Sequence, residues 1–163
     1  MLKTFTFIVP DAPHPCQRAA PVYGQRRMTD THDNRRAKKF VAKCVLEKVR
    51  EMGGFEAFTG AIHIECVYWI EKPKSKIRKR STPYPFPDCK PDIDNYLKTT
   101  MDGIQRANGI KSQDGIEPED RIPIIWSDDG QVVSCKAEKR WCVEGMEPMT
   151  EVSLVEVVNE TNN

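Results

Sequence analysis

Residues 61–70, AIHIECVYWI, place apolar or aromatic side chains at every second position. Because successive side chains of a strand point to opposite faces, this alternation predicts a strand with one buried face. Residues 4–9, TFTFIV, alternate in the same way, and residues 131–143 and 151–158 are also β-prone. The chain is therefore expected to build a sheet that hides one face from solvent.

Two segments between these strands have the apolar spacing of helices. The first starts at Thr31, a predicted N-cap, and continues until the glycine pair at 53–54. The second is predicted over residues 94–107, with Asn-Gly at 108–109 ending it. This order predicts an α+β fold, in which a mixed or antiparallel sheet of about four strands carries two main helices on one face.

The length of 163 residues favours one domain, residues 1–163. The net charge of +1 conceals an uneven distribution, because residues 72–80 hold six Lys or Arg and no acid. These basic residues lie in a proline-rich segment, residues 71–91, which is expected to form a long loop. Residues 109–127 are expected to be an extended surface connection.

Composition also bears on the cellular compartment. No apolar run approaches the roughly 20 residues of a membrane helix, and the apolar N-terminal stretch is too short for a signal peptide. The six cysteines include no CxxC pair, so reduced thiols are expected rather than a disulfide or zinc framework. A cytoplasmic protein is the expectation.

The segment KPDIDNYLK, residues 90–98, sets two carboxylates close together. Asp92 is expected in extended backbone and Asp94 near a helix N-cap, so that both side chains can converge on one point. Lys98 lies one turn further on the same helical face as Asp94. A second acidic pair, Asp128 and Asp129, follows in the SDDG sequence before a predicted strand. Mg²⁺ would relieve the repulsion between such carboxylates, since it prefers hard oxygen ligands.

Each of these features also has a purely structural interpretation. The two aspartates at 92 and 94 could cap a helix in solvent, and Asp94 with Lys98 could be an ordinary ion pair along a helix. The sequence DDG at 128–130 is common in turns. The adjacent basic segment favours the metal interpretation, because in a nuclease acids hold the ion and bases hold the polyanion.

The combination of KPDIDNYLKTTMDGI with WSDDGQVVSCKAEKRW resembles the RusA family of Holliday-junction resolvases. The resemblance implies that Asp92, Asp94 and Asp129 bind the catalytic metal and that Lys98 is the catalytic lysine. It implies supportive roles at five further motif positions, which are Asn95, Asp102, Asp128, Gln131 and Lys139.

The same resemblance implies a Mg²⁺-dependent endodeoxyribonuclease, with Mn²⁺ as a substitute ion and no organic cofactor. A homodimer would resolve four-way DNA junctions by paired symmetric nicks during recombination and repair, with no membrane association. The residues expected to contact DNA phosphates are Lys74, Lys76, Arg78, Lys79 and Arg80. The alternatives are a non-catalytic DNA-binding module and another Mg²⁺-dependent phosphoryl-transfer enzyme, although no Gly-rich phosphate loop is present.

Overall fold

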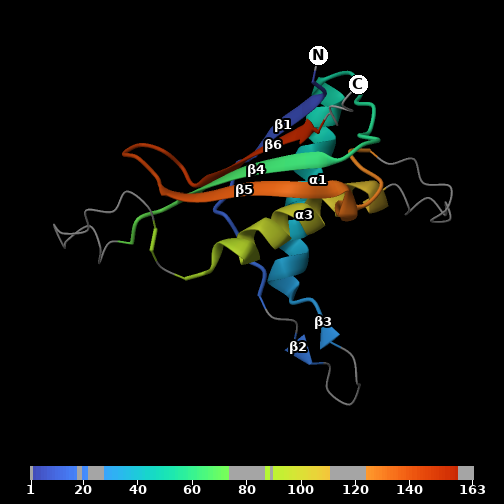
Figure 1. Ribbon diagram of the computed structural model, residues 1–163. Coiled ribbons are helices and arrows are strands. Elements are labelled where there is room, and N and C mark those ends of the chain that lie inside the picture. The colour runs from blue at the N-terminus through green and yellow to red at the C-terminus, as the bar shows by residue number, and fades with distance from the viewer. Residues whose placement is uncertain are drawn as a thin grey trace.

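The computed structural model describes residues 2–17, 20–21, 28–73, 87–88, 90–110 and 124–157. Its elements follow the order β1 (Thr4–Val9), β2 (Ala20–Pro21), β3 (Met28–Thr29), α1 (His32–Glu51), β4 (Ile62–Ile70), α3 (Ile93–Ile110), η3 (Asp129–Gln131), β5 (Val132–Trp141) and β6 (Met149–Glu156). The predicted α+β class is confirmed: α1 and α3 lie on the same side of one sheet (Figure 1).

The main sheet is mixed and has the strand order β1-β6-β4-β5. β6 pairs antiparallel with both β1 and β4, whereas β4 and β5 are parallel. The chain therefore leaves β4, returns along α3 and enters β5 in the direction of β4. Because β4 and β5 are parallel, α3, which connects them, runs in the opposite direction. Figure 1 shows α3 lying beneath β5.

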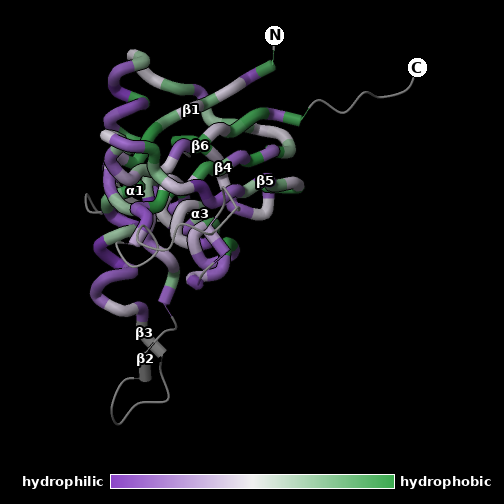
Figure 2. The backbone as a smooth tube through the Cα atoms, turned by 90° about the vertical axis from the view of Figure 1, so that its left-hand side faces the viewer, coloured by the Kyte–Doolittle hydropathy of each residue, from purple (hydrophilic) through white to green (hydrophobic). Residues whose placement is uncertain are grey.

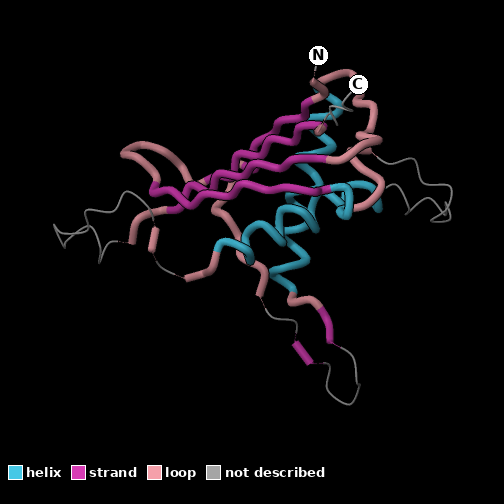
Figure 3. Tube along the Cα trace, in the orientation of Figure 1, coloured by secondary structure: helices cyan, strands magenta, loops and turns pink. Residues whose placement is uncertain are grey.

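The core lies between the sheet and the two helices. Phe5 and Phe7 of β1 and Ile64 of β4 point inward, while the residues between them face outward. Hydrophobic segments accordingly gather in the strands, and α1 is largely hydrophilic along its exposed side (Figure 2). A much smaller sheet, β2 with β3, lies beyond the start of α1 (Figure 3).

The first helix was predicted correctly. Thr31 is the N-cap, and its hydroxyl accepts a hydrogen bond from the backbone N–H of Asn34 at 3.1 Å. Beyond the other end, Gly53 has a φ of +74°, a left-handed conformation that favours glycine and ends helices. Gly54, with a φ of +120°, extends this turn.

Two expectations near the second helix were wrong. Asn108 and Gly109 do not end it, because the helix continues to Ile110 and the side chain of Asn108 is buried in tertiary hydrogen bonds. Its amide donates to the carbonyl of Trp126 at 2.6 Å and accepts from the N–H of Ile124 at 2.9 Å. Residues 111–123 of the expected surface connection lie outside the described residues, whereas its described end, residues 124–126, is buried and not on the surface.

Within the described ranges, no helix has the length and apolar character needed to cross a membrane. The cysteines found there are free thiols, as expected. Burial raises the pKa of the Cys66 thiol to about 12, so this side chain is protonated and unreactive at neutral pH.

Candidate active site

Two exposed carboxylates stand at the start of α3. Asp92 directly precedes the helix, and Asp94 lies in its first turn. The N–H of Asn95 bonds to the carbonyl of Asp92 at 3.2 Å, and the Asn95 side chain donates to Asp94 at 3.3 Å. Among the described residues neither carboxylate forms an ion pair, and both are close to the positive end of the helix dipole. The first turn thus presents negative charge to solvent.

The lysine of the motif is also exposed. Lys98 follows Asp94 by four residues in α3, so the two side chains share the helix surface that faces away from the sheet. The buried side of the same helix carries Tyr96, Thr99 and Thr100. The position of Lys98 therefore allows it to contact the same ligand as the aspartates.

The start of α3 is held in place from two sides. The ammonium of Lys139, on β5, donates to the carbonyl of Pro91 at 3.1 Å. On the other side, the N–H of Cys16 donates to the carbonyl of Asn95 at 2.8 Å. These two bonds anchor the backbone immediately before Asp92 and immediately after Asp94.

A buried asparagine extends this anchorage, and sequence reasoning missed it. Asn34 is fully buried near the start of α1. Its side chain accepts from the N–H of Gln17 and donates to the carbonyl of Gln17, both at 2.9 Å, and so fixes the residue next to Cys16. A signal was available, because Asn34 continues the apolar stripe formed by Ala37 and Val41 at helical spacing.

Asp102 has a structural partner rather than a position beside the other acids. Its carboxylate lies 2.8 Å from the ammonium of Lys38 on α1, and Asp30 approaches the same ammonium at 2.5 Å. Burial lowers the pKa of Lys38, but the two carboxylates outweigh burial and raise it overall. The hydrogen bond from Lys38 lowers the pKa of Asp30. Asp102 therefore joins α3 to α1.

Asp128 and Gln131 form the turn that precedes β5. Asp128 caps η3 by accepting from the N–H of Gly130 at 2.7 Å. Gln131 accepts from the N–H of Ser127 at 2.7 Å and donates to the carbonyls of Phe58 at 3.2 Å and Gly60 at 3.0 Å. Asp128 therefore has the structural role in a turn that the sequence DDG suggested. Asp129, in the same turn, is exposed to solvent.

Asp129 does not meet Asp92 and Asp94 within one chain. Gln105, near the far end of α3, donates to the carbonyl of Ser127 at 3.4 Å, so the turn lies beside that end (Figure 1). Gln105 follows Asp94 by eleven residues in the helix, which corresponds to a separation of roughly 16 Å. In keeping with this, no group of three or more potential metal ligands occurs among the residues that the structure describes. A single chain therefore does not bring Asp129 together with Asp92 and Asp94.

The predicted DNA-contacting residues lie outside the described residues. Contact between this basic segment and DNA phosphates stays a prediction from its charge. The five residues concerned are Lys74, Lys76, Arg78, Lys79 and Arg80.

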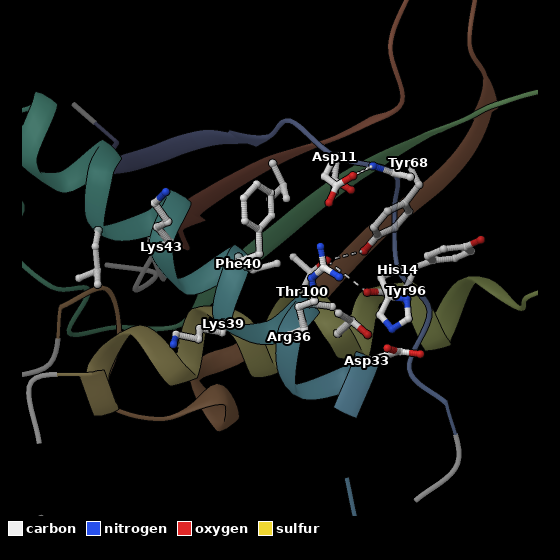
Figure 4. A pocket seen from close by; sticks show the side chains of 17 residues that line it. Asp11, His14, Asp33, Arg36, Lys39, Phe40, Lys43, Tyr68, Tyr96 and Thr100 are labelled. Atoms are coloured by element: carbon white, nitrogen blue, oxygen red, sulfur yellow. Dashed lines mark hydrogen bonds between the residues drawn. The ribbon is translucent and has the colours of Figure 1, made fainter. Parts of the chain in front are cut away.

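A pocket of about 760 Å³ lies elsewhere, between the segment after β1, the first half of α1 and the sheet (Figure 4). Arg36 and His14 contribute polar groups, and the rings of Tyr68 and Tyr96 stack with centroids 5.2 Å apart. Burial raises the pKa of Tyr68, so its phenol stays protonated, 3.2 Å from the hydroxyl of Thr100. None of the predicted catalytic residues lines this pocket, so the exposed aspartates of α3 do not belong to it.

The protein has a mixed sheet with two helices on one face, and a carboxylate pair with a lysine lies at the start of one helix. This arrangement is typical of a candidate hydrolase that acts on a polyanion such as nucleic acid. The family model described as Endodeoxyribonuclease RusA matches residues 10–116, more than half of the chain. The chain belongs to this family. It is an endodeoxyribonuclease of the class that acts on Holliday junctions, as the resemblance implied. Curated protein sequences yield no significant match. The matched range includes Asp92, Asp94 and Lys98 and ends before Asp129.

Proposed function

We propose that this endonuclease is a Mg²⁺-dependent homodimer that resolves four-way DNA junctions by paired nicks in opposed strands. The observation that carries the proposal is the pair of exposed carboxylates at the start of α3, with Lys98 one turn along the same helix. Family membership supplies the substrate class.

The residues at the start of α3 fit a divalent cation. Asp92 and Asp94 are exposed carboxylates, and within the described part of the chain no cation from the protein neutralises them. Hard oxygen ligands suit Mg²⁺, which commonly binds one or two protein carboxylates together with substrate phosphate. Mn²⁺ takes similar ligands and would substitute. When bound, the ion would supply a hydroxide-like nucleophile and stabilise charge on the phosphodiester.

The chain's own side chains would position the carboxylates and neutralise charge on the scissile phosphate. Lys98 would donate to a non-bridging oxygen of the scissile phosphate and offset the negative charge that develops there. Lys139 and Asn95 would keep the two carboxylates in register with that phosphate, because they hold the backbone on either side of Asp92. The basic residues within 74–80 would contact phosphates along a junction arm.

The position of Asp129 supports a dimer. Since Asp129 lies at the opposite end of α3 from Asp92, we infer that a metal site with three carboxylates uses Asp129 of the partner subunit. A two-fold dimer would then contain two equivalent composite sites. Two sites related in this way would match a junction whose opposed strands are also related by a two-fold axis.

Cleavage of a synthetic four-way junction, with and without Mg²⁺, tests the reaction. Asp92→Asn and Asp129→Asn should each abolish nicking while leaving junction binding largely unchanged, because neither change removes a basic side chain. Cleavage at the normal rate by either variant would refute the assignment of the site.

A mixture of the two inactive variants tests the composite arrangement. In a heterodimer of Asp92→Asn with Asp129→Asn, one composite site is intact, so nicking of a single strand should return. A mixture of Asp92→Asn with Asp94→Asn is the matched control, because every site in that heterodimer lacks one carboxylate. If only the control regained activity, or if neither mixture did, the shared site would be wrong.

A further inference from the structure

The short segment 16–17 joins the start of α1 to the start of α3. The N–H of Cys16 donates to the carbonyl of Asn95 in α3, and the N–H of Gln17 donates to the side chain of Asn34 in α1. The described residues 12–17 form no hydrogen bond to either helix apart from those with Asn34 and Asn95. Two consecutive residues therefore connect the two helices, and the segment passes between their first turns (Figure 1).

The side chain of Asn34 binds both polar groups of the Gln17 main chain. Its carbonyl oxygen accepts from the N–H and its amide nitrogen donates to the C=O, each at 2.9 Å. Because a carboxamide is planar, two bonds to one residue fix the orientation of Gln17 as well as its distance. Asn34 is fully buried, so removing either partner would leave a buried polar group unsatisfied.

The orientation of Gln17 in turn limits the direction of the Cys16 N–H. Peptide units are planar, so only the φ and ψ angles of Cys16 separate its own N–H from that of Gln17. The bond from Cys16 to Asn95 is 2.8 Å long. Asn34 therefore holds, through one intervening residue, the donor that binds the first turn of α3.

This turn is the one that carries the carboxylates. Asn95 directly follows Asp94, and its own N–H bonds to the carbonyl of Asp92 at 3.2 Å. The first turn of a helix has few hydrogen bonds of its own and frays easily, so bonds from outside the helix matter most there. Two such bonds reach the start of α3, one from Lys139 and one from Cys16, and the second depends on Asn34.

We propose that Asn34 is a positioning residue for the metal site, which acts by orienting Cys16 and so fixes the first turn that holds Asp92 and Asp94. This inference rests on the proposed function, because the site that Asn34 would position is the one proposed there. Removing an outer partner of a metal ligand typically costs 10–100-fold in metal affinity or activity. Because Asn34 acts through the backbone of another residue, we expect a loss at the lower end, about tenfold.

Two substitutions at Asn34 and one control separate positioning from stability. Asn34→Ala removes both bonds to Gln17. Asn34→Asp keeps the acceptor but replaces the donor with a carboxylate oxygen, which repels the Gln17 carbonyl. The dipole of α1 favours a carboxylate in its first turn, so Asn34→Asp should preserve the helix. Val45→Ala is the matched control, because it leaves a cavity at a buried position of α1 eleven residues further on.

Hydrogen exchange of the Cys16 amide, followed by NMR on the full chain, measures the positioning without metal or DNA. In both Asn34 variants this amide should exchange about tenfold faster than in the parent, because the segment that carries it opens locally. In Val45→Ala the Cys16 amide should exchange at the parental rate, since its bonds are intact.

Metal binding and cleavage measure the consequence. Calorimetric titration with Mn²⁺ should give a Kd about tenfold higher in both Asn34 variants. Single-turnover cleavage of the four-way junction at subsaturating Mg²⁺ should slow by a similar factor, while junction affinity stays parental because a buried, uncharged residue contacts no phosphate. Val45→Ala should match the parent in all three measurements, which a loss caused by lower stability would not allow.

Each contrary result has a distinct meaning. If the Cys16 amide exchanges at the parental rate in Asn34→Ala, the side chain does not hold segment 16–17 and the inference is wrong. It is equally wrong if exchange accelerates but Mn²⁺ affinity and cleavage stay parental, or if Val45→Ala loses as much as Asn34→Ala. A parent chain that neither binds Mn²⁺ nor cleaves the junction would refute the proposed function, and the role of Asn34 with it, whatever the Cys16 amide does.

Discussion

Replacing Gly103 with alanine sets two opposed effects against each other at the contact between α1 and α3. Alanine in a helix interior is favoured over glycine by about 1 kcal/mol. The added Cβ, however, would lie 2.5 Å from the Cβ and 2.7 Å from the Cγ1 of Val41, and 3.2 Å from the carbonyl of Lys38. Val41 is buried and its β-branched side chain has little rotamer freedom, so it cannot move aside.

Relief therefore requires α1 and α3 to separate. Overpacking of this kind costs about 1–3 kcal/mol and can cost more. Because the closest contact is with a Cβ and not with the end of a flexible chain, we expect Gly103→Ala to destabilise the fold by about 1–2 kcal/mol after the helix propensity is counted. For a chain of this size that corresponds to a decrease in Tm of about 2–8 °C.

Urea unfolding followed by tryptophan fluorescence measures this change, since Trp126 is fully buried. In a double-mutant cycle, Val41→Ala should relieve part of the clash, so the double variant should be more stable than additivity predicts by about 0.5 kcal/mol or more. Gly60→Ala is the matched control, because its new Cβ would meet only the flexible carboxylate of Glu156, at 3.3 Å. A Gly103→Ala protein as stable as the parent would refute the close packing of the two helices.

Three further predictions concern the groups that hold the site. Lys38→Met should destabilise the fold by about 1–3 kcal/mol in urea unfolding, because it leaves two partly exposed carboxylates facing each other. Since Lys38 lowers the pKa of Asp30, that part of the stability is present above about pH 4 and is lost as the pH falls further, so the two proteins should converge in stability below pH 4. Lys139→Met should slow single-turnover junction cleavage by about 10–100-fold while junction affinity stays unchanged, because the segment before Asp92 loses its anchor. Gln131→Leu should cost about 1–3 kcal/mol in thermal unfolding, since it removes the bonds that tie the turn before β5 to the neighbouring loop.

Each of these has its own comparison. Lys43→Met is the comparison for Lys38→Met, because it removes an ion pair with Glu47 on the same helix, at 3.6 Å. Both of these side chains are well exposed, so the free energy of unfolding should change by no more than about 0.5 kcal/mol. If Lys139→Met cleaved at the parental rate, the bond from Lys139 to the carbonyl of Pro91 would not be needed to hold the segment before Asp92. If Gln131→Leu had the parental Tm, the bonds from Gln131 to Phe58 and Gly60 would not stabilise the fold.

Local patterns were sufficient for most of the elements. Residues 4–9 and 62–70 form strands where alternation predicted them, and α1 spans the predicted segment because its cap and its terminating glycines act within a few residues. The carboxylates at 92 and 94 were also placed correctly at a helix start. Asn108 was misread because its side chain bonds to residues beyond a long connection, a partner that no local pattern contains.

The sequence by itself determined which segments are strands and helices, and which acidic and basic residues are available for chemistry, because periodicity and side-chain type are local properties. Only the tertiary structure decided that β4 and β5 are parallel, since strand direction depends on pairing between distant segments. That direction makes α3 run the opposite way and puts Asp129 at the far end of the helix from Asp92. The distance between these acids, and with it our proposal that a second subunit completes the site, therefore follows from topology and not from the motif.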